Sequence, residues 1–268
     1  MRARIVALIA VALGLWGVLH DDDDALRVAT FNIEYYPQTQ GQAERAVDVI
    51  GTLNAPVIAV QEITDAPHLE RTAQERLGSE WRVAASKHRF ATAVLYDSDR
   101  LELISTREYA ESVVAPNTLP TFEARFDDDD SHIPLRVIVI HLKAASDGLP
   151  IRKQQLAALA PVLAKARESG ERLVVLGDFN ATGDDDRAMI RALARDLGLH
   201  WTTEALTCTC FWQRKDDCVG SRLDHVLSSQ APASVDVAGA CAQGCPATDR
   251  CPAWREEVSD HCPVIVEF

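Results

Sequence analysis

The chain has 268 residues, of which 47% are hydrophobic and 25% charged, and its formal net charge at pH 7 is −13. This composition is that of a globular protein and excludes a collagen-like chain, a coiled coil or a wholly disordered protein. The acidic charge excludes tight, non-specific binding to a polyanion, which needs many Lys and Arg side chains, but not a nuclease that binds weakly and turns over quickly. The length fits one large α/β domain or two small ones.

The first twenty residues have the pattern of an export signal. Two arginines precede an apolar run, Ile5–Leu19, which is short for a membrane-spanning helix and has the length of a signal-peptide core. The acidic stretch Asp21–Asp24 follows without a clear cleavage motif or a lipid-attachment cysteine. We predict a signal peptide or an uncleaved N-terminal anchor over residues 1–20. The folded domain, residues 25–268, is then secreted or periplasmic and in either case outside the cytoplasm.

Strand-like and helical segments mix along the rest of the chain. Seven runs rich in Val, Ile and Leu are predicted as buried strands: 27–33, 56–61, 92–96, 135–142, 173–176, 223–227 and 263–268. Apolar residues at helical spacing predict helices over 42–53, about 151–167 and about 185–197, and Gly170 is expected to end the second. The chain has no evident linker, internal repeat or Pro/Ser-rich hinge, so we predict a single domain.

The seven cysteines all lie between Cys208 and Cys262, and such clustering in an exported protein indicates local disulfides. Six of them can form three bridges, and the sequence does not give the pairing. We predict that Cys262, just before an apolar strand, is the unpaired, buried thiol. A structural zinc site is the alternative, but the spacing lacks the paired Cys-x2-Cys knuckles of such sites.

Three aspartate runs, Asp21–Asp24, Asp127–Asp130 and Asp184–Asp186, suggest either calcium binding or solvated loops. None has the residue spacing of a calcium loop with its closing Glu. We therefore predict solvated loops.

Polar residues suited to metal binding and proton transfer gather near the ends of the predicted strands. In chain order they are Asn32, Glu62, His141, Asp178, Asn180, Asp224, Asp260 and His261. A turn-forming or bystander role explains any one of them, but not the ordered set. Carboxylate and amide oxygens are the ligands of a hard cation such as Mg²⁺. In-line attack of water on a phosphodiester needs a base, an oriented imidazole and donors to the phosphoryl oxygens. The set therefore predicts metal-assisted hydrolysis of a phosphate ester.

Not every histidine belongs to this set. His225 directly follows Asp224 within a predicted strand, and neighbouring strand residues point to opposite faces of a sheet. We therefore predict that His225 points away from the site and is not catalytic.

Two motifs carry a family resemblance: Gly177-Asp178-Phe179-Asn180, and Ser259-Asp260-His261 before an apolar strand. Together with the other site residues in order, they resemble the endonuclease/exonuclease/phosphatase superfamily, which includes DNase I-like nucleases and neutral sphingomyelinases. The resemblance runs from Arg27 to the C-terminus. It implies an α/β, DNase I-like fold: a four-layer sandwich of two mixed β-sheets flanked by helices, with the site at one edge between the sheets.

The same resemblance implies a metal site. Glu62 looks like the principal ligand, helped by Asn32 and Asp260. The expected cation is Mg²⁺, with Mn²⁺ or Ca²⁺ as alternatives.

It also implies the catalytic roles. Asp178 looks like the residue that positions or deprotonates the attacking water, and Asn180 would hold the scissile phosphate. His261 would contact the phosphate or act as base, while Asp224 fixes its tautomer. His141 matches a second histidine of the DNase I-like branch, a general acid or phosphate ligand.

The chain departs from that branch near Arg89. A carboxylate there supports the second histidine in DNase I-like enzymes, but this chain has Lys87-His88-Arg89-Phe90 and no acidic residue. Cations that could contact phosphate are Arg89, Lys143, Arg152 and Lys153. For Arg152 and Lys153, the alternative is a solvated helix start.

These inferences predict a secreted, divalent-metal-dependent phosphodiesterase, with nucleic acid as substrate and no obligate protein partner, acting as a monomer. A sphingomyelinase-like phospholipid phosphodiesterase is the alternative, for which Phe211 and Trp212 offer apolar contacts. A non-catalytic binding module is the alternative of another class, and the presence of every expected polar residue argues against it. The cysteine-rich loops Cys208–Cys218 and Cys241–Cys251 precede site residues and are expected at the rim of the site.

Overall fold

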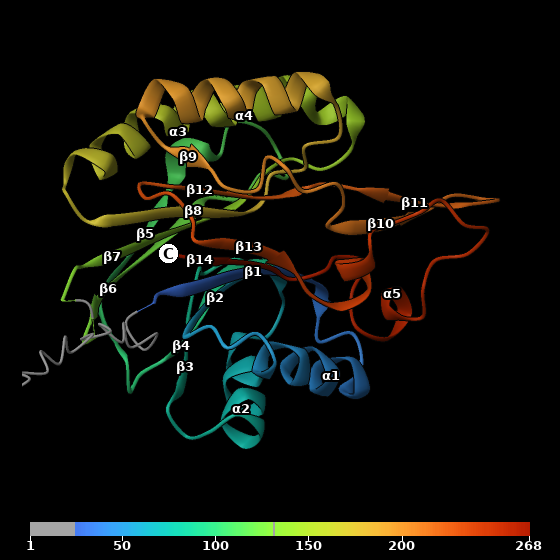
Figure 1. The fold of residues 1–268 in the computed structure, drawn as a ribbon, viewed down its shortest axis with the longest axis horizontal. Coiled ribbons are helices and arrows are strands. Elements are labelled where there is room, and N and C mark those ends of the chain that lie inside the picture. Colours follow the sequence, from blue (N-terminus) through green and yellow to red (C-terminus); the bar gives the residue numbers. More distant parts are fainter. Residues whose placement is uncertain (1–24, 131) are drawn as a thin grey trace, which may run out of the picture.

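Two six-stranded β-sheets face each other in the computed structural model, which describes residues 25–130 and 132–268 (Figure 1). Helices cover the outer face of each sheet, so the order of layers is helix, sheet, sheet, helix (Figure 1). This arrangement confirms the predicted four-layer α/β sandwich. The predicted leader and the stretch Asp21–Asp24 lie outside the described residues.

Three groups of elements build the fold. The first sheet consists of β1 (Arg27–Tyr36), β2 (Val57–Ile63), β3 (Trp81–Ala85), β4 (Ala91–Asp97), β13 (Ser234–Val237) and β14 (Val264–Glu267). The second consists of β5 (Leu101–Tyr109), β6 (Thr121–Asp128), β7 (Leu135–His141), β8 (Arg172–Asp178), β9 (His200–Trp201) and β12 (Asp224–Ser228). A separate hairpin is formed by β10 (Cys210–Gln213) and β11 (Cys218–Ser221), and the α-helices are α1 (Gln40–Gly51), α2 (Ala66–Arg76), α3 (Leu149–Glu168), α4 (Asp184–Leu197) and α5 (Trp254–Glu257).

Both sheets are mixed. The first has the order β13-β14-β1-β2-β4-β3, and the second has the order β5-β6-β7-β8-β12-β9. β1 pairs with β2 and β7 with β8 in parallel, and the other pairs are antiparallel. The parallel pairs lie at the centre of each sheet, so the ends of β1, β2, β7 and β8 meet at one edge of the sandwich.

The core explains why the central strands are apolar along their whole length. Val28 and Val137 face into the space between the sheets. Ile58 faces the layer of α1 and α2, and Ile140 packs with Leu159 of α3. Because both faces of each central strand are buried, there is no polar face to give an alternating pattern. Among the described residues, no helix is long and apolar enough to cross a membrane.

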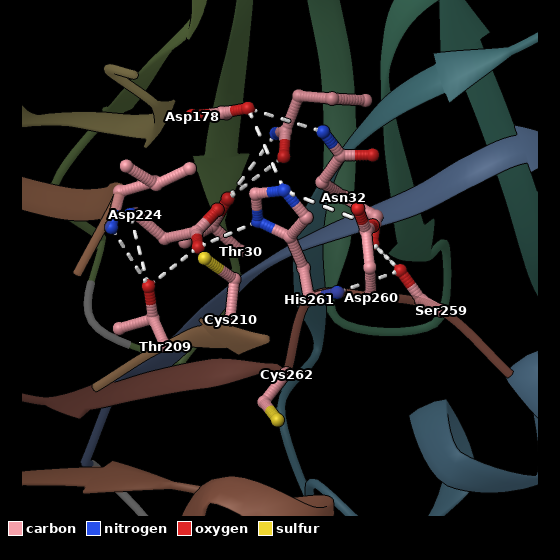
Figure 2. A network of polar contacts seen from close by, with 12 residues as sticks. Thr30, Asn32, Asp178, Thr209, Cys210, Asp224, Ser259, Asp260, His261 and Cys262 are labelled. Carbon is pink, nitrogen blue, oxygen red and sulfur yellow. Dashed lines mark hydrogen bonds and ion pairs between the residues drawn. The ribbon is translucent and has the colours of Figure 1, made fainter. Parts of the chain in front are cut away.

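The disulfides correct the prediction for the free thiol. Cys208 pairs with Cys245, Cys218 with Cys251 and Cys241 with Cys262, and the free, buried cysteine is Cys210. Cys262 follows His261, and because neighbouring residues of an extended segment point to opposite sides, its sulfur points away from the cluster of polar side chains around His261 (Figure 2). It therefore meets Cys241 instead. With six sulfurs in disulfides, these cysteines supply no thiolates for the alternative zinc site.

The aspartate runs are not simply solvated loops. Asp184–Asp186 form the first turn of α4, where carboxylates are favoured by the helix dipole. Asp186 is buried, and so is Asp128 at the end of β6, where it lies 3.4 Å from the Nε of Arg100. In both places a buried ion pair accounts for the acidic residue.

Candidate active site

The eight predicted site residues converge at the edge where the two sheets meet. The strands β1, β2, β7, β8 and β12 carry Asn32, Glu62, His141, Asp178 and Asp224. Asn180 follows β8 in the chain, and the segment before β14 contributes Asp260 and His261. A cavity of about 540 Å³ opens over this edge and is lined by six of the eight. Asn32 and Asp224 lie beneath it, fully buried.

Local backbone geometry aims the key carboxylates at this cavity. The pairing of β2 with β1 and β4 is interrupted by a register shift, and Glu62 sits there with φ of 64°. A non-glycine residue in this left-handed region costs about 1–3 kcal/mol, and such strain clusters at functional sites. Asp178 depends on its neighbour Gly177, whose φ is 137° and where any Cβ would collide with the carbonyl oxygen of Ile140. Only glycine fits before Asp178.

Asn32 joins the two central carboxylates. Its Nδ2 donates to Glu62 Oε1 and to Asp178 Oδ2, both at 3.2 Å, and its Oδ1 accepts from the backbone N–H of Glu34 at 3.1 Å. The backbone N–H of Tyr35 donates to the other oxygen of Glu62 at 3.3 Å. In this conformation Asn32 holds the carboxylates in place with its amide nitrogen, and its role as an oxygen ligand stays a prediction.

Asp178 lies at the centre of the cluster. Its Oδ1 accepts from the backbone N–H of Asn180 at 2.8 Å, and its Oδ2 accepts from the Asn180 side chain at 3.2 Å. Asn180, with φ of 50°, also donates to the carbonyl oxygen of Leu142. Burial raises the pKa of the Asp178 carboxyl, although the charge of His261 opposes the shift. A carboxylate with a raised pKa is a better proton acceptor than an exposed one.

His141 faces both acidic groups. Its Nε2 lies 3.8 Å from Glu62 Oε1 and 3.8 Å from Asp178 Oδ2. Its buried Nδ1 has no hydrogen-bond partner among the described residues, as the missing acidic residue near Arg89 predicts. In that segment, Nε2 of His88 lies 3.4 Å from Oε2 of Glu108.

His261 is held by a chain of buried groups (Figure 2). Its Nδ1 lies 2.8 Å from Asp224 Oδ2, and the same oxygen accepts from the hydroxyl of Thr209 at 2.7 Å. The Thr209 oxygen in turn accepts from the backbone N–H groups of Leu223 and Asp224, each at 3.1 Å. With Nδ1 bound to the carboxylate, Nε2 of His261 faces Asp178 Oδ2 at 3.8 Å and Asp260 Oδ1 at 3.9 Å.

Carboxylates crowd around this imidazole. Burial alone would lower the pKa of His261, but Asp224, Asp260 and Asp178 together raise it well above its usual value. Burial, and then the neighbouring Glu62 and Asp178, raise the pKa of Asp260 against the opposing charge of His261. Burial and Asp260 likewise raise the pKa of Glu34. This concentration of negative charge and oxygen donors fits a hard divalent cation, and Glu62, Asp260 and Asn32 are the residues that would hold it.

Three residues to which the sequence analysis assigns no role also belong to the site. Thr209 is one, and nothing marks it except its place in the cysteine-rich segment. Ser259 donates to the carbonyl oxygen of Asn32 at 2.7 Å and accepts from the backbone N–H of His261 at 3.0 Å, which fixes β1 to the His261 segment. Arg255 on α5 lines the cavity. Among the described residues, no carboxylate lies within ion-pair distance of Arg255, and its buried Nε has no partner.

The predicted phosphate-contacting cations separate into different environments. Lys143 lines a second cavity next to the site, and Arg89 lies over the ring of Phe90, 5.2 Å from its centroid. Lys153 is exposed on α3. Arg152 is neither solvated nor available to a substrate, because it is 1% exposed and its Nε donates to Asp186 at 2.7 Å. Both predicted roles of Arg152, a phosphate contact and a solvated helix start, were therefore wrong. Its guanidinium instead holds α3 against α4.

His225 points away from the site, as predicted. It is fully buried on the other face of β12, and its Nδ1 accepts from the indole N–H of Trp201 at 3.2 Å. Burial lowers its pKa to about 3, so it is neutral at physiological pH. Of the two aromatic residues considered for lipid contacts, Phe211 is buried, whereas Trp212 is 59% exposed at the cavity rim.

Comparisons with known proteins agree with this fold. A family model described as "Endonuclease/Exonuclease/phosphatase family" matches residues 29–261. No curated protein sequence is significantly similar to the chain. Among solved structures, the chain is similar to D. rerio TDP2 humanized by 14 mutations, with 17% identity, a TM-score of 0.68 and coverage of 91% of this chain and 99% of that chain. It is similar to D. rerio TDP2 complexed with single strand DNA product, with 15% identity, a TM-score of 0.66 and coverage of 91% and 98%.

It is also similar to a Bacteroides thetaiotaomicron mannosyl-6-phosphatase, with 16% identity, a TM-score of 0.63 and coverage of 90% of this chain and 98% of that chain. At these identities the structural likeness shows the fold alone. The family match spans most of the chain and includes all eight converging residues. The chain therefore belongs to the endonuclease/exonuclease/phosphatase family, whose members are metal-dependent phosphoesterases.

Proposed function

We propose that the chain is a secreted, divalent-metal-dependent phosphodiesterase that hydrolyses nucleic acids. The observation that carries the proposal is the arrangement around Asp178. Its carboxylate lies 3.8 Å from the imidazoles of both His141 and His261, and Asn32 links it to Glu62. A base, two imidazoles and a set of oxygen donors thus face one cavity, as attack of water on a phosphate ester requires.

Each residue has a part in the proposed reaction. Glu62, Asp260 and Asn32 would hold the divalent cation, which would supply a positive charge that stabilises the phosphoryl oxygens and makes water a better nucleophile. Asp178 accepts the proton of the attacking water.

The remaining groups act on the phosphate. Asn180 orients Asp178 and the scissile phosphate. Nε2 of His261 donates to a phosphoryl oxygen, while Asp224 holds the ring in the tautomer that places the proton there. His141 donates from the other side, toward the leaving group. Arg255 supplies a guanidinium whose charge also opposes the burial-driven rise in the pKa of Glu34 and Asp260 and whose buried Nε has no hydrogen-bond partner in the described part of the chain.

Two observations support the substrate class and the compartment. The similar TDP2 structure holds a single strand DNA product, which supports a nucleic-acid substrate. Three disulfides support an oxidising compartment outside the cytoplasm. One observation favours a phospholipid substrate as the second candidate: Trp212 is 59% exposed at the cavity rim, where a membrane-facing aromatic residue would sit.

The test uses the protein produced with its disulfides formed. It is mixed with Mg²⁺ and either single-stranded oligonucleotide or supercoiled plasmid, with EDTA and His261→Ala as controls. Cleavage of either nucleic acid that both controls abolish is the expected result. If the folded protein cleaves neither but releases phosphocholine from sphingomyelin in a His261-dependent way, the nuclease proposal is wrong and the phospholipid candidate is correct.

A further inference from the structure

A side cavity of about 380 Å³ adjoins the catalytic cavity. The two share four lining residues, among them Glu62 and His141. Because these two residues belong to the candidate active site, a group that occupies the side cavity lies directly next to the scissile phosphate. The side cavity therefore takes the part of the substrate that is bonded to that phosphate.

The walls of the side cavity suit a flat, apolar ring. Phe90, Leu119 and Leu142 form part of them. Tyr35 is 51% exposed and lies at the boundary between the two cavities. Phe90 packs edge-on against it, with ring centroids 5.5 Å apart and an interplanar angle of 74°. An exposed aromatic ring held by a second ring is the kind of platform on which a nucleobase stacks.

A cation lies beside this platform. Lys143 lines the side cavity, and no carboxylate among the described residues lies within ion-pair distance of its ammonium group. An aromatic platform next to an unpaired cation fits a nucleotide, which has a base and a further phosphate. An acyl chain needs no cation, and a volume of about 380 Å³ is at the small end of the roughly 300–1,000 Å³ range of ligand pockets. The size and the charge therefore both favour a nucleotide.

We propose that the side cavity is a nucleobase subsite, in which the base next to the scissile phosphate stacks on Tyr35 while Lys143 contacts the neighbouring phosphate. This inference rests on the proposed nuclease function and adds a substrate preference to it. A base that enters the cavity has left the stack of a duplex, which costs energy unless the strand is already single. The enzyme therefore prefers single-stranded nucleic acid.

The test compares three substrates: a single-stranded oligonucleotide, the same strand with abasic residues in place of nucleosides, and a duplex. We expect the wild-type protein to cleave the base-bearing single strand with the highest kcat/KM. Tyr35→Ala should lower kcat/KM on that strand by about 5- to 100-fold, the effect of one lost stacking contact, and change kcat/KM on the abasic strand by less than about twofold. Tyr35→Phe keeps the ring and should remain close to wild type.

Two further variants complete the design. Leu119→Trp fills the side cavity without altering Tyr35 and should produce the same selective loss. Ile104→Ala removes an exposed apolar side chain of β5 that lines neither cavity, so it should leave all three rates unchanged. Thermal melting shows whether each variant is folded.

The failure of this inference differs from failure of the proposed function. Equal cleavage of the abasic and base-bearing strands by the wild-type protein overturns the subsite but leaves the nuclease function intact. The subsite is also overturned, with the nuclease function intact, if folded Tyr35→Ala and Leu119→Trp lose kcat/KM equally on the abasic and the base-bearing strand. If the folded wild-type protein cleaves no nucleic acid at all, both the proposed function and the subsite are overturned.

Discussion

Thr209 offers the sharpest test of how His261 is oriented. Its hydroxyl donates to Asp224 Oδ2 at 2.7 Å and accepts two backbone N–H groups, and the residue is fully buried. Thr209→Val keeps the shape but removes these three hydrogen bonds. A hydrogen bond to a charged group contributes about 1.5–3 kcal/mol, and each buried group left without a partner costs about 1–3 kcal/mol. Allowing for partial relaxation, we expect a loss of about 2–4 kcal/mol in the free energy of unfolding.

The loss of activity should be separable from the loss of stability. A positioned acid–base group contributes roughly 10²–10⁴-fold to rate, so a partly misoriented His261 should lower kcat by about 10- to 100-fold. Thr209→Ser keeps the hydroxyl and should restore most of it.

Thr203 is a matched control, because it contacts His225 on the opposite face of β12 from Asp224. Thr203 is also fully buried, contacts His225 Nδ1 at 3.2 Å and accepts from the backbone N–H of Val226 at 3.1 Å. Thr203→Val should therefore also lower the free energy of unfolding, through the loss of buried hydrogen bonds, but without changing kcat. Urea unfolding and steady-state kinetics on both variants provide the two readouts. If both variants lose stability and neither loses activity, Thr209 has only a structural role and the argument fails.

Three other predictions concern charge and the disulfides. Because the pKa of folded His225 is about 3, against about 6.5 when unfolded, the unfolded chain binds the extra proton as pH falls below 6.5. Its contribution to stability is complete above that pH and is lost by up to about 1.4 kcal/mol per pH unit toward pH 3. In urea unfolding, the free energy of unfolding should therefore fall less steeply with decreasing pH in His225→Phe than in the wild type. Parallel pH curves for the two proteins would contradict this. Arg255→Ala should lower kcat/KM by about 10-fold and weaken the salt dependence of kcat/KM, because one charge-assisted contact is worth about 1.5–3 kcal/mol. The control Glu256→Ala, at an exposed neighbouring residue, should change neither quantity. An equal effect of both variants would exclude a specific contact of Arg255 with phosphate. Verified reduction of the disulfides should lower activity or melting temperature, and an unchanged protein would refute the idea that they hold the site.

Some elements follow from sequence and others do not, for physical reasons. Most residues of the seven predicted strands are buried, and the three predicted helices each bury one apolar face, so their patterns are strong. β5 was missed because it lies at the edge of its sheet and exposes most of its side chains. α2 was missed because only Leu69, Thr72 and Ala73 of its eleven residues are buried, too few for a helical stripe.

Some residues of the candidate site could likewise be predicted from the sequence, and others could not. Residues at the ends of central strands could be predicted to meet, because the strand order brings those ends to one edge. The places of Thr209 and Arg255 in the site could not be predicted, because they depend on how the cysteine-rich segment folds back on the sheets. An antiparallel bridge pairs Cys210 with His261, and this pairing places Thr209 under Asp224 and leaves Cys210 rather than Cys262 unpaired.

The position of the disulfides has a consequence for when the enzyme becomes active. Thr209 and Arg255 both lie in the segment that the three bridges close, so the bridges help to hold both residues in place. Newly made chains in a reducing cytoplasm lack those bridges. On the proposed function, a chain still inside the cell would then carry the metal ligands but not a fully assembled site. Oxidation during export would complete the enzyme only where the producing cell's own nucleic acids are out of reach.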